Sequence, residues 1–308
     1  MLKFNGSILT RDSAWLNTKA TLPDGTIRFR FWNNYTPTSG TDSSNTSKFG
    51  VWTAVDASQG IWDWTCNDRT SWLNAFDNRL TQANMGNRYC RILEANFGSV
   101  TSARQMFRNC TRLESVENTH LTNVTTAYYM FYGAANIRKA EIYDTSKLTN
   151  AAYMFAYIYS LTNVTLFDTS HVTDFGSMFY TCYGLTSVPA FNTSNGTKFD
   201  YFLGVCTSLT SIPLFDTSNA VDMQYMCYNC TSLKRIPLFD TSSCSNMNSA
   251  FSYCERVETG ALDLYNQASS QAVPPSSHNA TFNNCGSSTV SGAAELAQIP
   301  QSWGGTMV

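Results

Sequence analysis

The chain has 308 residues, which is enough for one long repeat array or for two ordinary domains. Only 14% of the residues are charged and the net charge is −2, so the sequence lacks the basic surface that nucleic-acid binding requires. Hydrophobic residues make up 43% of the chain, which excludes a disordered protein. The chain shows neither a run of about 18 apolar residues nor the apolar core of a signal peptide near its start. We therefore expect no membrane insertion and no leader-directed export.

The first 68 residues differ in character from the rest and predict a small β-rich domain. Six of the seven tryptophans lie within the first 72 residues. Residues 27–31 alternate between apolar and basic side chains, as a half-buried strand does, and residues 49–53 and 61–65 are further strand candidates. We expect residues 1–68 to be an attachment domain and residues 69–95 to be a junction that holds a first, helical cap.

From residue 96 onward the sequence repeats every 24 residues. The repeat is marked by a Met-Phe pair, which is then degraded in the later units. The pairs are Met106-Phe107, Met130-Phe131, Met154-Phe155, Met178-Phe179, Phe202-Leu203, Met226-Cys227 and Ala250-Phe251. One such unit cannot bury its apolar face alone, and stacking on its neighbours buries it. The spacing therefore predicts a seven-unit solenoid over residues 96–260.

Each unit contains two kinds of segment. Apolar residues recur at intervals of three or four in the first, which predicts one face of a short helix. In the fourth unit these are Val172, Phe175, Met178, Phe179 and Cys182. Residues 185–191 indicate an extended segment that ends in a turn. The predicted fold class is an α/β leucine-rich-repeat-like solenoid of short parallel strands and short helical turns, with strands recurring from about residue 113 to residue 240.

The last part of the chain, residues 261–308, predicts a C-terminal cap with one distorted unit. Phe282 and Cys285 keep the internal spacing of the repeat but arrive late in the 24-residue phase. Residues 262–268 and 292–299 favour helices, and Trp303 is expected to cover the open end of the stack. Terminal repeats are atypical because they close the array.

Residues 209–219, which include Phe-Asp-Thr-Ser, and the later Cys-Thr-Ser-Leu of residues 230–233 resemble BspA-like leucine-rich repeats. The likeness is to the "FDTS…MxxMFxxCxSL" type, which occurs in bacterial surface proteins and in phages of gut bacteria, and it covers about residues 96–260. The ending, from residue 264 to residue 305, is similar to that of such gut-phage proteins. The resemblance implies adhesion or assembly rather than catalysis, although fold alone does not decide which.

Cysteine is the first residue type that suggests chemistry, since the chain has ten. Six of them occupy one repeat column: Cys110, Cys182, Cys206, Cys230, Cys254 and Cys285. Parallel side chains on successive units do not give the dihedral of about 90° that a disulfide prefers, so inward packing as small apolar groups is favoured. Zinc binding by Cys227 and Cys230 would need a second matching pair. We expect structural cysteines and neither a metal nor a cofactor.

Histidine and aspartate give no catalytic signature. The three histidines, at positions 120, 171 and 278, have no recognisable nucleophile or carboxylate motif around them. Four aspartates share a column in which Thr-Ser follows each: Asp144, Asp168, Asp216 and Asp240. Capping of the following turn explains this column, and a cation held between adjacent carboxylates is the alternative. We expect the protein not to be an enzyme.

Tyrosine is the more suggestive residue type. Two columns flank the Met position, and their members are Tyr129, Tyr153, Tyr201 and Tyr225, and Tyr132, Tyr180 and Tyr228. They can be the rim of the packed face, or they can be a recognition strip for carbohydrate or protein, because tyrosine offers a large contact at small entropic cost. Residue pairs between the Leu and Val columns vary, as Arg138-Lys139 and Lys234-Arg235 show.

The resemblance and these patterns together predict a non-enzymatic phage virion protein of the tail or head fibre or decoration type. Its solenoid would recognise a host-surface glycan or protein, and its N-terminal domain would contact other virion proteins. It would be made in the host cytoplasm and lie on the virion surface. A bacterial cell-surface adhesin and a purely structural virion subunit are the alternatives, and a homo-oligomer is left open. No nucleic-acid partner is expected.

Overall fold

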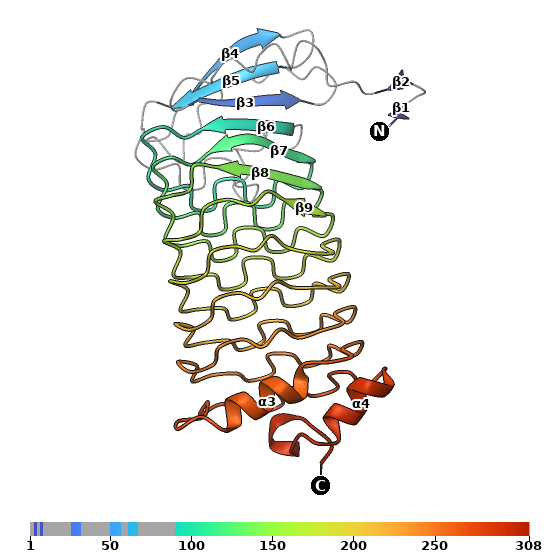
Figure 1. Ribbon diagram of the computed structural model, residues 1–308. Coiled ribbons are helices and arrows are strands. Elements are labelled where there is room, and N and C mark those ends of the chain that lie inside the picture. The colour runs from blue at the N-terminus through green and yellow to red at the C-terminus, as the bar shows by residue number, and fades with distance from the viewer. Residues whose placement is uncertain are drawn as a thin grey trace.

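The computed structural model describes residues 3–4, 7–8, 26–31, 50–56, 61–66 and 90–307. Its main sheet has seven strands in the order β4-β5-β3-β6-β7-β8-β9. A separate pair is formed by β1 (Lys3–Phe4) and β2 (Ser7–Ile8). Figure 1 shows the main sheet passing into a stack of coils that ends at two helices. No described helix is long and apolar enough to cross a bilayer.

The N-terminal strands are those that the alternating pattern predicts, and they are antiparallel to one another. They are β3 (Thr26–Phe31), β4 (Gly50–Asp56) and β5 (Ile61–Cys66). They belong to the same sheet as the repeats, because β3 pairs antiparallel with β6 (Cys90–Asn96). The expected helical cap is therefore wrong for residues 90–96, where pairing on both edges of β6 overrides local preference. Residues 69–89 lie outside the described part.

The repeat strands are parallel, as expected. They are β7 (Ser115–His120), β8 (Lys139–Tyr143) and β9 (Asn163–Val164). Val116 lies opposite Ala140, and Ala140 lies opposite Val164. The expectation that strands recur as far as residue 240 is wrong, since the last described repeat strand ends at Val164.

Proline ends the strand ladder. In the third unit the residue after the Val column is Thr165, whose N–H donates to the Ala140 carbonyl (3.1 Å). In the next three units this position is occupied by proline, which has no N–H to donate to the preceding coil. These residues are Pro189, Pro213 and Pro237. The segments around them stay extended but form no ladder.

The segment expected to be helical is instead a series of turns. The N–H of Met106 donates to the Ala103 carbonyl (3.2 Å), and the third residue of that turn, Gln105, has a φ of 56°. Phe107 donates to Met130 of the next coil (2.8 Å), where an α-helix would bond within itself. Consecutive turns also place apolar residues three and four positions apart, so their spacing resembles one face of a helix.

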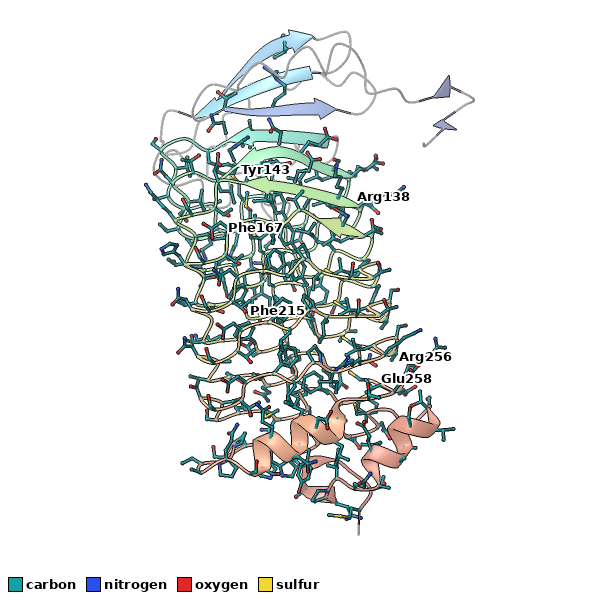
Figure 2. The ribbon with its side chains drawn as sticks, in the orientation of Figure 1. Arg138, Tyr143, Phe167, Phe215, Arg256 and Glu258 are labelled. Carbon is teal, nitrogen blue, oxygen red and sulfur yellow. The ribbon has the colours of Figure 1, made fainter. Side chains whose placement is uncertain are left out.

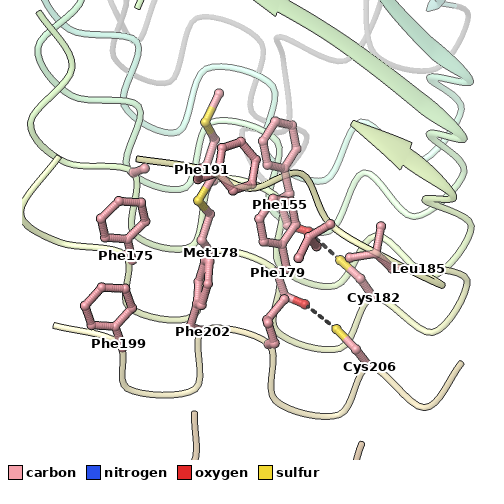
Figure 3. Packing of buried hydrophobic residues seen from close by; sticks show 14 of the residues in the cluster. Phe155, Phe175, Met178, Phe179, Cys182, Leu185, Phe191, Phe199, Phe202 and Cys206 are labelled. Carbon is pink, nitrogen blue, oxygen red and sulfur yellow. Dashed lines mark hydrogen bonds between the residues drawn. The ribbon is translucent and has the colours of Figure 1, made fainter. Parts of the chain in front are cut away.

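Side chains stack inside the coils in columns that run along the array. The rings of Phe107, Phe131, Phe155 and Phe179 are stacked, with successive centroids 5.3, 5.7 and 5.5 Å apart. Figure 2 shows Phe167 and Phe215 within the stack, and Figure 3 shows its central layers closely. A buried threonine column adds bonds between coils, since the Thr169 hydroxyl donates to the Asn192 carbonyl (2.7 Å). Packing and inter-coil bonding therefore repeat together.

The C-terminal cap contains α3 (Ala261–Ser269), α4 (Val290–Leu296) and the 3-10 turn η3 (Gln301–Trp303). Trp303 is 6% exposed, and its ring stacks on His278 with centroids 4.2 Å apart. Its carbonyl accepts a bond from the N–H of Phe282 (2.8 Å). The tryptophan thus covers the last apolar layer, as the sequence indicates.

Candidate recognition surface

The first tyrosine column lies in the turn segment and has an unusual backbone. Tyr129, Tyr153, Tyr201 and Tyr225 have φ values of 59°, 57°, 53° and 55°. This left-handed region is costly for residues other than glycine. Each N–H is held by the next coil, as when Tyr129 donates to the Ala152 carbonyl (3.1 Å). The stacking of the coils therefore fixes where these rings project.

The structure brings the two tyrosine columns into contact. Tyr129 and Tyr153 stack with centroids 4.4 Å apart, and Tyr201 and Tyr225 stack at 4.5 Å. Tyr180 of the second column meets Tyr201 edge to face at 5.2 Å. The seven predicted tyrosines, which include Tyr132 and Tyr228, are all half-buried.

Sequence reasoning missed further members of this surface. Tyr157 bridges Tyr132 (5.0 Å) and Tyr180 (5.3 Å). Tyr159 and Tyr183 stack at 5.2 Å and are 45% and 43% exposed, more than any of the predicted seven. They fall in other columns, so only the enrichment of tyrosine throughout the turn segment could have indicated them. We call the whole set the tyrosine rim: Tyr128, Tyr129, Tyr132, Tyr153, Tyr157, Tyr159, Tyr180, Tyr183, Tyr201, Tyr225, Tyr228 and Tyr253.

The rim is both packed and accessible. Arg108 lies 5.1 Å from the centre of the Tyr129 ring, which also stacks on Tyr153, so the faces of that ring are engaged within the protein. Burial raises the pKa of Tyr157 to about 12, so its hydroxyl stays protonated and able to donate. The middle of the rim thus offers ring edges and hydroxyls, while Tyr159 and Tyr183 offer larger ring surfaces.

Charge is distributed unevenly along the turn segment. Arg104 lies 4.8 Å from the centre of the Tyr128 ring, at the N-terminal end. Farther along, burial raises the pKa of Asp200, with smaller contributions from the neighbouring carboxylates of Asp222 and Asp174. Lys198 approaches Asp174 at 3.9 Å. One end of the array is therefore cationic on this side and the middle is anionic.

The cysteine column points inward, and all six members are at most 2% exposed. The eight cysteines in the described part of the chain whose side chains are placed are free and buried. The Cys182 thiol donates to the Phe155 carbonyl (3.1 Å) and the Cys206 thiol to the Phe179 carbonyl (3.2 Å), as Figure 3 shows. Burial raises the pKa of Cys182 to about 12, which leaves little reactive thiolate.

The aspartate and histidine columns have structural partners. Asp168 accepts a bond from the Ser170 N–H (2.9 Å), which is the turn capping that the sequence predicts, and this contact lowers the pKa of the Asp168 carboxyl. His120 contacts Asp144 through Nδ1 (2.6 Å) and Asn118 through Nε2 (3.2 Å). Among the described residues, no three His, Cys, Asp or Glu side chains gather closely enough to hold a metal ion.

Comparison with known proteins gives the family. The chain matches the family described as "Mycoplasma protein of unknown function, DUF285" over residues 54–163, 101–187 and 159–265. No curated protein shows significant similarity to it. A leucine-rich repeat protein from Eubacterium ventriosum, known from a crystal structure, is 17% identical with a TM-score of 0.33. That similarity covers 55% of this chain and 57% of the other, so it spans little more than half of that protein. The family matches extend over more than half of the chain, which therefore belongs to the DUF285 family of BspA-like leucine-rich-repeat proteins.

Proposed function

We propose that this protein is a non-enzymatic recognition protein and that the tyrosine rim is its contact surface for a glycan or protein on a cell. The rim itself is the observation that carries the proposal. Twelve tyrosines from successive coils join through ring contacts, and the backbone bonds between coils hold them in place. Tyrosine loses little side-chain entropy on binding, so a surface built from it is suited to recognition.

The repeat explains why such a surface can be adapted. Each 24-residue unit repeats the same inward columns, while outward residues such as Arg138 and Arg256 lie at the margin of the stack (Figure 2). Substitutions at exposed positions away from special contacts change stability little. Individual contacts on this surface would be weak, and several copies on one particle would give firm attachment.

The placement on a phage particle is part of the same proposal and is supported by the resemblance of the repeats and of the C-terminal ending. Strands β3, β4 and β5 extend the sheet at one end of the stack (Figure 1). This end would contact other virion proteins while the coils project. A bacterial surface adhesin would use the tyrosine rim in the same way.

The test removes hydroxyls without removing the packed rings. Tyr129, Tyr153 and Tyr225 are replaced together by phenylalanine, and attachment of the full chain to candidate host cells is measured. We expect weaker attachment with a nearly unchanged melting temperature. Tyr143→Phe is the matched control, because Tyr143 is exposed on β8 outside the rim. The proposal gains independent support if replacing Tyr159 and Tyr183 by serine also weakens attachment. Full attachment by both variants would overturn it.

A further inference from the structure

An open pocket of about 410 Å³ lies at the N-terminal end of the turn segment, beside the tyrosine rim. It is lined by Ser102, Arg104, Thr126, Tyr128 and Asn150. Parallel bridges join Ser102 to Thr126 and Thr126 to Asn150, so three coils build it on a fixed backbone. The pocket is therefore formed before any ligand arrives.

Its polar side chains are held with hydrogen-bond donors to spare. Thr126 Oγ accepts a bond from the Tyr128 N–H (3.4 Å), and Asn150 Oδ1 accepts one from the Ala152 N–H (3.0 Å). These contacts orient both side chains and leave the Thr126 hydroxyl hydrogen and an amide hydrogen of Asn150. A ligand rich in oxygen acceptors matches such a lining.

The charge in the pocket is positive. The guanidinium of Arg104 lies over the Tyr128 ring at 4.8 Å, which restricts its motion, and none of the described ion pairs involves it. Its N–H groups suit the planar or tetrahedral oxygens of a carboxylate or sulfate. Arg108 and Arg112 follow at intervals of four residues and add to the positive charge of this coil.

The same positions in later coils would repel an anion. Those equivalent to Ser102 and Arg104 are held in the next coils by acidic, small or mixed residues. They are Asp174 and Gly176, Lys198 and Asp200, and Asp222 and Gln224. The anion-compatible site is thus confined to the first coils.

We infer that this pocket binds an acidic saccharide, with its carboxylate or sulfate on Arg104 and its hydroxyls on Ser102, Thr126 and Asn150. This inference rests on the proposed recognition function and names a ligand class for one part of that surface. The bound sugar would lie against the edge of the tyrosine rim, and the rest of a longer glycan could continue along it.

The test titrates the full chain with a tetrasaccharide ending in glucuronate, with its neutral glucose-ended counterpart and with a sulfated counterpart, by calorimetry. We expect the neutral compound to bind at least about tenfold more weakly, and the two acidic arms to show which anion is preferred. Arg104→Ala should weaken acidic binding about tenfold, Arg104→Lys should weaken it less, and Arg256→Ala, at an exposed arginine outside the pocket (Figure 2), should change nothing.

Equal binding of the neutral compound, no binding of any saccharide, or unchanged binding by Arg104→Ala would overturn the inference. So would Arg104-dependent binding of a tetraglutamate peptide that matches the saccharide in affinity. If these results appear while the tyrosine variants still lose cell attachment, the pocket assignment fails and the proposed function stands.

Discussion

At Cys182 a single side chain serves both the apolar column and the bonding between coils. Its thiol donates to a carbonyl 27 residues earlier, and Cys206, Cys230 and Cys254 do the same. The repeat column was enough to predict burial. It could not predict the hydrogen bond, because the bond joins two different columns and its span is not the 24-residue period.

Cys182→Ala removes this donor and leaves a small void. We expect it to lower the free energy of unfolding by about 1–3 kcal/mol, measured in denaturant. Cys244→Ala is the control, since the Cys244 thiol has only longer contacts, of 3.4 and 3.7 Å. Equal losses in the two variants would show that packing alone matters at Cys182.

Asp200 predicts a pH dependence. Its folded pKa is raised above the ordinary 3.8 by burial and then by Asp222 and Asp174, whereas Lys198 acts weakly in the other direction. The folded state then binds the proton more tightly than the unfolded state, so its contribution to stability is present below pH 3.8 and is lost as pH rises through the raised pKa. At pH 7 the ionised group is a net cost.

Asp200→Asn should therefore raise the melting temperature at pH 7 and have a smaller effect below pH 3.8. Asp168→Asn should act in the opposite direction at pH 7, because the pKa of Asp168 is lowered by its bonds to Ser170. A lower melting temperature for Asp200→Asn at pH 7 would contradict the assigned pKa direction.

At the scale of elements, the sequence predicted the strands near the N-terminus and the C-terminal helices more accurately than the repeat segments. Alternation in residues 27–31 is specific for a strand, and β3 forms there. Intervals of three and four are shared by helices and by consecutive turns, so they could not distinguish the two. Proline at position 189 was visible in the sequence, and its missing N–H was the available reason to end the ladder early.

The C-terminal cap depends on one contact between its helices. Glu295 of α4 accepts bonds from the N–H groups of Gly260 (3.3 Å) and Leu262 (3.0 Å), at the start of α3. Glu295→Ala should cost about 1 kcal/mol of unfolding free energy, as loss of a helix cap does, with a smaller cost for Glu295→Gln. The control is Glu258→Ala, at an exposed position on the edge of the stack (Figure 2). Wild-type stability of Glu295→Ala would exclude this capping role.

At the scale of the whole molecule, the array is one sheet and one core rather than a domain joined to a solenoid. β6 pairs with β3 on one edge and with β7 on the other, so the direction of pairing changes from antiparallel to parallel at this strand. Composition indicated the change near this point, since tryptophan is concentrated before it. It could not show that both parts share a sheet, because that depends on pairing between distant segments.

The account places recognition on the tyrosine rim, and the extended segments give the rival surface. Leu166, Leu214 and Leu238 are exposed there by 62%, 66% and 52%. Hydroxyl-radical footprinting of the full chain, free and bound to cells, compares the two surfaces in one experiment. We expect Tyr159 and Tyr183 to become protected while the three leucines keep their reactivity. Protection of the leucines with unchanged reactivity of the tyrosines would contradict the account.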